Sequence, residues 1–297
     1  MSERADTAYS PRFREEEHSA AAERIVLRLF RQSVCDPAIF GIILRTMFEV
    51  RNIAFTYRKK QVLRDVSFVV SPGEAVCVAG ANGAGKTTLL KVLATLAVPD
   101  SGMVTVDGQN ALARPLRYRR QLGYLPERVA LYEDMTVKEY LHYRALLKGE
   151  MSKRIRRRID EACETCRIAH LLRTPIRSLS AGLAKRVAFA DAILLRPRVL
   201  LLDDLLAGLD SGMRADMGEI VSAAAAFSAV VVTGHELDDL AKWANRFLVL
   251  KDGVISSTIT AVGAPPEAVR AKLDAALRGV PHVKEADKAE EKKGGEK

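Results

Sequence analysis

Between residues 47 and 258, hydrophobic and polar positions form short strand-like and longer helix-like segments with turn signals between them. Two segments with period-two alternation open this region and predict a pair of strands. Three later runs are continuously apolar, which is typical of strands buried on both faces. The last apolar segment is interrupted by Asp252-Gly253, a turn that predicts a hairpin. The predicted strands are 48–57, 62–70, 75–79, 198–203, 229–233 and the hairpin 247–257.

Helix-like segments alternate with these strands. Thr136 and Glu139 have the spacing of a capping box, in which each side chain accepts a hydrogen bond from the backbone of the other residue. Buried strands that alternate with helices are typical of an α/β fold. Helices are predicted to start at about Lys86 and within 135–141, to span 152–168 and about 180–195, and to follow Pro265-Pro266.

The pattern divides the chain into three zones. Residues 1–46 form an N-terminal extension with a short amphipathic helix at 19–32; they are either a genuine appendage or an over-extended start, and we favour the second. The folded zone is 47–258, which opens at Met47 with clean strand alternation. Residues 259–297 are expected to hold one helix and a disordered, charged tail.

Composition narrows the class of protein. The chain has 297 residues, of which 48% are hydrophobic and 28% charged, as in ordinary soluble proteins. Its most apolar stretch, 25–44, is interrupted by charges and a proline, and no segment approaches the roughly 18 apolar residues that cross a bilayer. The first residues also lack the pattern of a secretory signal. We therefore expect a cytoplasmic protein.

The net charge of +9 is concentrated most densely at 153–158, Lys-Arg-Ile-Arg-Arg-Arg. Such a run can attract nucleic acid or an anionic membrane surface. The solvated face of a helix is the favoured interpretation, and no nucleic-acid partner is expected.

Cys163 and Cys166 form a C-x-x-C pair. A structural zinc site requires a second pair of ligands, and none is nearby in the sequence. We interpret the pair as two residues on one helix.

The strongest chemical signal follows the predicted strand 75–79. The segment Gly-Ala-Asn-Gly-Ala-Gly-Lys-Thr-Thr fits the phosphate-loop pattern G-x-x-x-x-G-K-[ST]. Its glycines allow backbone N–H groups to surround phosphate oxygens, and the helix that follows presents its positive end to the same anion. Lys86 would reach the terminal phosphates, and Thr87 would place its hydroxyl on Mg²⁺. The residues of the loop are Gly80, Ala81, Asn82, Gly83, Ala84, Gly85, Lys86, Thr87 and Thr88.

Two adjacent aspartates, Asp203 and Asp204, follow the four apolar residues 199–202. Carboxylates at the tip of a buried strand are costly unless a cation or a reacting group uses them. A magnesium nucleotide site needs a carboxylate at the end of a neighbouring strand. We therefore predict that Asp203 serves Mg²⁺ and that Asp204 faces the water that attacks the nucleotide.

With these parts in view, residues 47–258 resemble the nucleotide-binding domain of the ATP-binding cassette (ABC) family. The resemblance implies a P-loop NTPase of ABC type: a RecA-like core, an antiparallel β subdomain and a helical subdomain inserted at about 128–180. The matching segments are Tyr57, LGYLPE at 122–127, LSAGLAKRVAFADAIL at 179–194, AGLD at 207–210 and VVTGHELDDL at 231–240.

The resemblance assigns contacts to the nucleotide. It implies that Tyr57 stacks on adenine and that His235 polarises the γ-phosphate or the attacking water. Glu127 lies in the Q-loop, which senses the γ-phosphate and touches the membrane partner.

The resemblance also implies a dimer that holds two ATP molecules between its subunits. Ser180 and Gly182 of the signature motif would contact the γ-phosphate held by the opposite subunit, and Asp210 would lie at the dimer interface. A helix that begins near 180 offers a second N-terminus for an anion, and a two-fold dimer brings it to the partner's phosphate loop.

Two of the matching motifs depart from the family pattern. The signature usually reads LSGGQ, whereas here Ala181 and Leu183 replace a glycine and the glutamine. The usual Q-loop glutamine is Glu127, whose carboxylate can still bind Mg²⁺ but cannot donate a hydrogen bond when ionised.

The catalytic loop departs as well. Asp204 stands where the family has glutamate, and Leu205-Leu206 replaces Pro-Thr. The shorter side chain predicts a functional but slow ATPase, because misplacing a reacting group by about 1 Å can cost on the order of a hundredfold in rate.

We expect an ATPase subunit that powers transport through a separate permease, with export favoured, and that lies at the inner face of the cell membrane through this permease. Its partners would be the permease and a second ABC subunit, in a homodimer or a heterodimer. The alternatives are a soluble ABC protein not tied to transport, for which the basic run 153–158 is the only support, and a catalytically weak regulatory cassette.

Overall fold

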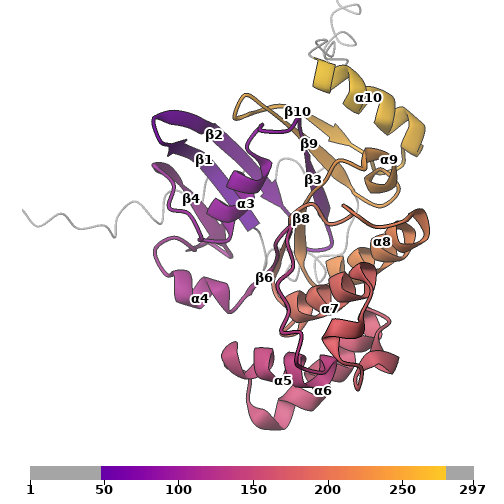
Figure 1. Ribbon diagram of the computed structural model, residues 1–297. Coiled ribbons are helices and arrows are strands. Elements are labelled where there is room, and N and C mark those ends of the chain that lie inside the picture. Colours follow the sequence, from indigo (N-terminus) through magenta and orange to yellow (C-terminus); the bar gives the residue numbers. More distant parts are fainter. Residues whose placement is uncertain (1–47, 279–297) are drawn as a thin grey trace, which may run out of the picture. The chain divides into compact units, whose positions relative to one another are not determined.

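The computed structural model describes residues 48–278 (Figure 1). The helix expected at 19–32 and the charged end of the chain lie outside this range. In chain order the strands are β1 (Phe48–Tyr57), β2 (Lys60–Val70), β3 (Ala75–Ala79), β4 (Ser101–Val106), β5 (Gln109–Asn110), β6 (Leu122–Leu125), β7 (Val199–Leu202), β8 (Ala229–Thr233), β9 (Arg246–Lys251) and β10 (Val254–Thr260). They form a four-stranded antiparallel sheet in the order β2-β1-β4-β5 and a six-stranded sheet in the order β10-β9-β3-β8-β7-β6.

The helices lie between and beside these strands. They are α3 (Lys86–Leu93), α4 (Pro115–Arg119), α5 (Val137–Leu147), α6 (Ser152–Thr165), α7 (Ala181–Ile193), α8 (Ser211–Ala225), α9 (Leu237–Leu240) and α10 (Pro266–Arg278), with two 3₁₀ turns, η2 (Ala169–Leu171) and η3 (Ile176–Ser178).

The six-stranded sheet is parallel from β9 to β6, and only β10 pairs antiparallel, with β9. Every residue of β3, β7 and β8 is buried, as the continuous apolar runs predict. Parallel strands end at the same edge of a sheet, where an α/β fold places its ligands. The loops that begin at residues 80, 203 and 234 therefore start side by side.

Alternate residues of the central strands face two different cores. Val76 and Val78 of β3 pack with the antiparallel sheet and α3, whereas Ala75, Cys77 and Ala79 pack on the side of α5 to α8. The central sheet is thus covered on both faces. The edge at which its parallel strands end carries the polar loops and is where a functional site is expected. Together these layers form the RecA-like core, the antiparallel subdomain and the inserted helical segment of the expected fold.

The helical segment between β6 and β7 is anchored to α7 by a cluster of charges. Asp191 of α7 forms ion pairs with two cations at the C-terminal end of α5, at 2.9 Å from Arg144 Nε and 2.7 Å from Nζ of the capping residue Lys148. Asp191 is largely buried, so the two cations offset the cost of removing its charge from water. As a result α5 is tied to the helix that follows the signature motif.

Sequence reasoning predicted most strands correctly but overlooked short or weakly patterned elements. The hairpin around Asp252-Gly253, the five-residue strand 75–79 and the capping box at Thr136 are all present. The basic helix α6 ends at Thr165, earlier than the predicted residue 168, because Arg167 adopts a left-handed conformation with φ 57°. The elements that the pattern missed are β4, β5, β6, α4, α8 and α9.

Each missed element lacks a long periodic signal. The strand β6 has only four residues. Helix α8 contains Gly218, a weak helix former, where a Cβ atom would lie 2.6 Å from the Trp243 ring. At this position glycine allows the Trp243 ring to pack closely against α8, where a residue of higher helix propensity would collide with the ring. No helix within 48–278 is long and apolar enough to cross a membrane.

The capping box generates a prediction about the helical segment. Thr136→Ala removes the hydroxyl that accepts the Glu139 N–H, so we expect the free energy of unfolding to fall by about 0.5–2 kcal/mol. Chemical denaturation of the full chain measures this loss. The matched control is Thr165→Ala, whose hydroxyl donates only to the Glu161 carbonyl of its own helix; its effect should stay within about 0.5 kcal/mol. Equal losses in both variants would contradict the capping role.

Candidate functional site

The loop between β3 and α3 has the conformation that an anion-binding loop requires. Gly83 and Gly85 have φ values of 78° and 107°, in the region that favours glycine. At Gly80 a Cβ atom would lie 2.5 Å from the Leu250 carbonyl oxygen, so β9 approaches too closely for a side chain. The Lys86 ammonium donates to the carbonyl oxygens of Gly80 (2.7 Å) and Ala81 (3.1 Å). The Lys86 side chain therefore folds back over the loop that precedes it in the chain.

Asp203 joins this loop to the end of β7. It is 2% exposed, and its Oδ1 accepts hydrogen bonds from the hydroxyls of Thr233 (2.8 Å) and Thr87 (3.2 Å). Burial raises the pKa of Asp203, while these two hydrogen bonds act in the opposite direction. The end of β7 and the first turn of α3 are thus linked through one carboxylate.

The donor set here fits Mg²⁺. A hydroxyl and a carboxylate, on Thr87 and Asp203, lie together at the base of the loop, and oxygen atoms are the ligands that this hard cation selects. Glu127 follows β6 and is exposed; its charge acts on Asp203 and raises the pKa of that group. A magnesium ion held by these residues would supply positive charge against nucleotide phosphates.

Asp204 has a strained backbone that is fixed at both ends. Its φ is 46°, a left-handed value that costs a non-glycine residue on the order of 1–2 kcal/mol. Its N–H donates to the Thr233 hydroxyl (2.9 Å), and its carbonyl accepts from Lys185 Nζ (3.2 Å). The next residues, Leu205 and Leu206, are fully buried in the core. The loop 203–206 is therefore held from three directions.

The Asp204 side chain has an unused acceptor. Within the described residues its Oδ1 is buried and has no hydrogen-bond partner. Burial raises the pKa of Asp204; His235 opposes this rise, while Glu236 and Glu127 add to it. An unpaired carboxylate oxygen at this edge of the sheet can accept a hydrogen bond from a water molecule.

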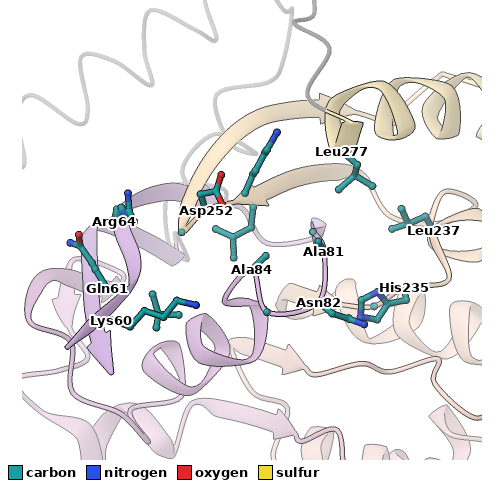
Figure 2. A pocket seen from close by; sticks show the side chains of 17 residues that line it. Lys60, Gln61, Arg64, Ala81, Asn82, Ala84, His235, Leu237, Asp252 and Leu277 are labelled. Atoms are coloured by element: carbon teal, nitrogen blue, oxygen red, sulfur yellow. The ribbon is translucent and has the colours of Figure 1, made fainter. Parts of the chain in front are cut away.

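A cavity of about 580 Å³ lies against the loop (Figure 2). Its walls include the loop residues 80–84, Gly234 and His235 after β8, the β9–β10 turn and Leu277 of α10. The basic side chains of Lys60, Arg64 and Lys251 also line it, so its charge favours an anion. His235, labelled in Figure 2, is exposed and belongs to the same cavity as the loop.

The structure does not bring every predicted site residue to this cavity. Ser180 caps α7 and accepts the Leu183 N–H (3.4 Å), and Asp210 caps α8 and accepts the Met213 N–H (2.9 Å). Gly182 lies against α8, where an added Cβ atom would collide with the Met213 sulfur. None of the three lines the cavity.

Tyr57 lies at the end of β1 with 59% of its surface exposed. The Arg58 guanidinium lies 5.6 Å from the centre of its ring, which is within the range of a cation–π contact. A large exposed aromatic surface beside the β1–β2 turn leaves the ring available for stacking.

Two residues of the site were not predicted. Thr233 is the single polar residue that ends the apolar run of β8, and this change of polarity was the available signal. Lys185 is a charged residue on the buried side of α7, 7% exposed, and helical periodicity alone did not mark it. Both contact Asp204 through its backbone.

Comparison with known proteins gives consistent results. A family model described as ABC transporter matches residues 63–207. The uncharacterized ABC transporter ATP-binding protein YxlF of Bacillus subtilis is 31% identical over 210 residues, which cover 71% of this chain and 70% of YxlF. The sulfate/thiosulfate import ATP-binding protein CysA of Bradyrhizobium diazoefficiens is 32% identical over 240 residues, covering 78% of this chain and 67% of CysA.

A solved structure of an ATP-binding subunit of an ABC transporter has the same arrangement of elements. It aligns with a TM-score of 0.67 at 28% identity, covering 77% of this chain and 100% of the solved chain. The similarity therefore extends from sequence to three-dimensional structure.

The threonine at the end of β8 generates a prediction. Thr233→Val keeps the shape of the side chain but removes the hydroxyl that bonds both Asp203 and Asp204. The Asp204 N–H then loses its partner, and the Asp203 carboxylate keeps only the hydrogen bond from Thr87. We expect the free energy of unfolding to fall by about 1–3 kcal/mol in chemical denaturation. Thr233→Ser retains the hydroxyl and is the control. If the serine variant lost as much stability as the valine variant, packing of the methyl group rather than the hydrogen bonds would explain the effect.

Proposed function

The chain belongs to the ABC transporter ATP-binding family, and from this premise we propose that it binds and hydrolyses ATP to power a separate membrane permease. The observation that carries the proposal is the meeting of the phosphate loop with the aspartate pair, through the bond from Thr87 to Asp203. Phosphate-binding groups and a candidate catalytic carboxylate thus occupy one edge of the parallel sheet.

Nucleotide binding follows from the loop. The backbone N–H groups of residues 80–88 and the N-terminus of α3 bind the phosphates, and Lys86 neutralises the β- and γ-phosphates. Thr87 and Asp203 hold Mg²⁺, with Glu127 as a further oxygen ligand. Tyr57 stacks on the adenine ring, since its exposed face lies beside the β1–β2 turn.

Hydrolysis uses the loop after β7. Asp204 accepts a hydrogen bond from the attacking water through its unpartnered oxygen and takes up the proton. His235, which lines the cavity together with residues 80–84 of the phosphate loop, donates to the γ-phosphate. Asp and Glu have similar intrinsic pKa values, about 3.9 and 4.3, so the shorter reach of Asp204 rather than its basicity makes the enzyme slow.

A second subunit completes the site. Ser180 and Gly182 stand at the N-terminus of α7 and do not line the cavity of their own chain. In a two-fold dimer they contact the nucleotide of the opposite subunit, and Asp210 lies at the interface between the subunits. The partner is a second ABC subunit, in a homodimer or a heterodimer.

The permease supplies the membrane path and the substrate. The chain is then peripheral on the inner face of the cell membrane, and the helical segment around α5 and α6 is the part that docks. Export remains the prediction from the sequence alone. Among the relatives, the similar CysA protein is named an import protein, so these relatives add no support for export.

The phosphate loop can be tested through its lysine. We expect Lys86→Ala to weaken ATP binding by about 1.5–3 kcal/mol, or roughly 10- to 150-fold, because a charge-assisted contact to the phosphates is lost. Nucleotide-dependent dimerisation and ATPase activity should be abolished while the circular dichroism spectrum stays unchanged. Lys91→Ala, on the exposed side of the same helix, is the control. Unchanged ATP affinity in Lys86→Ala would refute the assignment.

The catalytic carboxylate can be tested at one atom. Asp204→Asn should leave ATP binding intact, lower turnover by on the order of a hundredfold and trap a closed, ATP-bound dimer, because the amide cannot accept the proton. Asp204→Glu should keep or raise turnover, since it restores reach. Turnover and size-exclusion chromatography in ATP measure both effects. If Asp204→Asn hydrolyses ATP as fast as the parent, Asp204 is not the base and Glu127 is tested next.

A further inference from the structure

Lys185 is a buried cation whose hydrogen bonds go to the loop after β7. It lies in the second turn of α7 and is 7% exposed. Its ammonium donates to the carbonyl oxygens of Asp204 (3.2 Å) and Ala207 (2.8 Å). A buried ammonium is costly unless its hydrogen bonds are made, so this arrangement keeps the side chain tied to two backbone positions of one loop.

The loop needs such a tie. Asp204 has a left-handed backbone at φ 46°, and strained conformations persist only where the surroundings fix them. Its N–H is held by Thr233 of β8, and its carbonyl is held by Lys185 of α7. Because both peptide groups of Asp204 are fixed from outside the loop, the direction of its Cα–Cβ bond is fixed too.

We propose that Lys185 is a positioning residue for hydrolysis, which holds the backbone of Asp204 and Ala207 so that the Asp204 carboxylate is correctly placed toward the attacking water. The proposal rests on the function proposed for Asp204. In this role Lys185 acts through the backbone of the loop, to which its hydrogen bonds go.

The surroundings of Lys185 agree with a positioning role. Burial lowers its pKa, while the charges of Asp204, Glu236 and Glu127 act in the opposite direction and favour the ammonium form. Within the part of the chain that the structure describes, its hydrogen bonds nevertheless go to carbonyl oxygens. The carboxylate oxygen Oδ1 of Asp204 stays unpartnered, so Lys185 fixes this residue without blocking its side chain.

The position of Lys185 also connects two functional segments. It lies on the helix whose first residues, Ser180 and Gly182, face the nucleotide of the opposite subunit in the proposed dimer. Helix α7 is continuous from Ala181 to Ile193. Lys185 therefore links the N-terminal part of α7 to the carbonyl of Asp204 in the same subunit.

Kinetics of the full chain test this inference. Lys185→Met keeps the length of the side chain and removes the three N–H donors. We expect kcat for ATP hydrolysis to fall about 10- to 100-fold, as for a misplacement of about 1 Å, with KM and ATP affinity changed less than about twofold. Lys185→Gln retains two donors on a shorter side chain and should recover part of kcat.

The matched control is Lys148→Met. Lys148 is another partly buried lysine that bonds α7, through the Asp191 carbonyl and carboxylate, but it makes no contact with the catalytic loop among the described residues. We expect this variant to lose stability without a change in kcat. A fall in kcat equal to that of Lys185→Met would overturn the proposal, because loss of any buried lysine would then suffice.

A double variant separates this inference from the proposed function. If Lys185 acts through Asp204, Lys185→Met should have little further effect on kcat when Asp204 is already asparagine. Additive losses would overturn the inference while leaving the catalytic role of Asp204 intact. Full activity in Asp204→Asn alone would instead refute the catalytic role proposed for Asp204. If Asp204→Asn is slow but Lys185→Met retains the parent's kcat, only the positioning role fails.

Discussion

The hydroxyl of Thr233 is the contact on which the site depends. It donates to Asp203 and accepts from the backbone of Asp204, so one atom at the end of β8 fixes both aspartates at the end of β7. Asp203 in turn accepts from Thr87 at the start of α3. Two neighbouring strand ends and the start of α3 are thereby joined in a single, largely buried network, where each hydrogen bond counts more than it would in water.

Much of the fold was readable because its signals were local. The phosphate loop needs glycine where φ is positive, as at Gly85, and the eight-residue pattern G-x-x-x-x-G-K-[ST] marks this position directly. The central strands could be predicted from continuous apolar runs. The capping box of Thr136 and Glu139 predicted the start of α5. The strand β6 was not predicted because four residues are too few to show a periodic pattern. Helix α8 was not predicted because it contains Gly218, which has low helix propensity and is accommodated for its close contact with the Trp243 ring.

The support of the site was harder to predict than its reactive groups. Asp203, Asp204 and His235 are chemically conspicuous, whereas Thr233 and Lys185 act on the backbone of another segment far along the chain. No short-range spacing encodes such a contact, because it arises only when β8 and α7 pack beside the end of β7. The roles of Ser180, Gly182 and Asp210 depend on a second chain, and within one chain they are simply the residues that begin α7 and α8.

The two leucines after Asp204 decide where this region can bend. Both are completely buried, and withdrawing either side chain from the core would cost about 1.5–3 kcal/mol. The segment that carries Asp204 is therefore anchored in the hydrophobic core by these two side chains and is held rigidly. Gly208, exposed and at φ 73°, is the first residue beyond it without such an anchor. Any opening and closing movement of the segment that leads to α8 would pivot there, leaving the aspartate stationary.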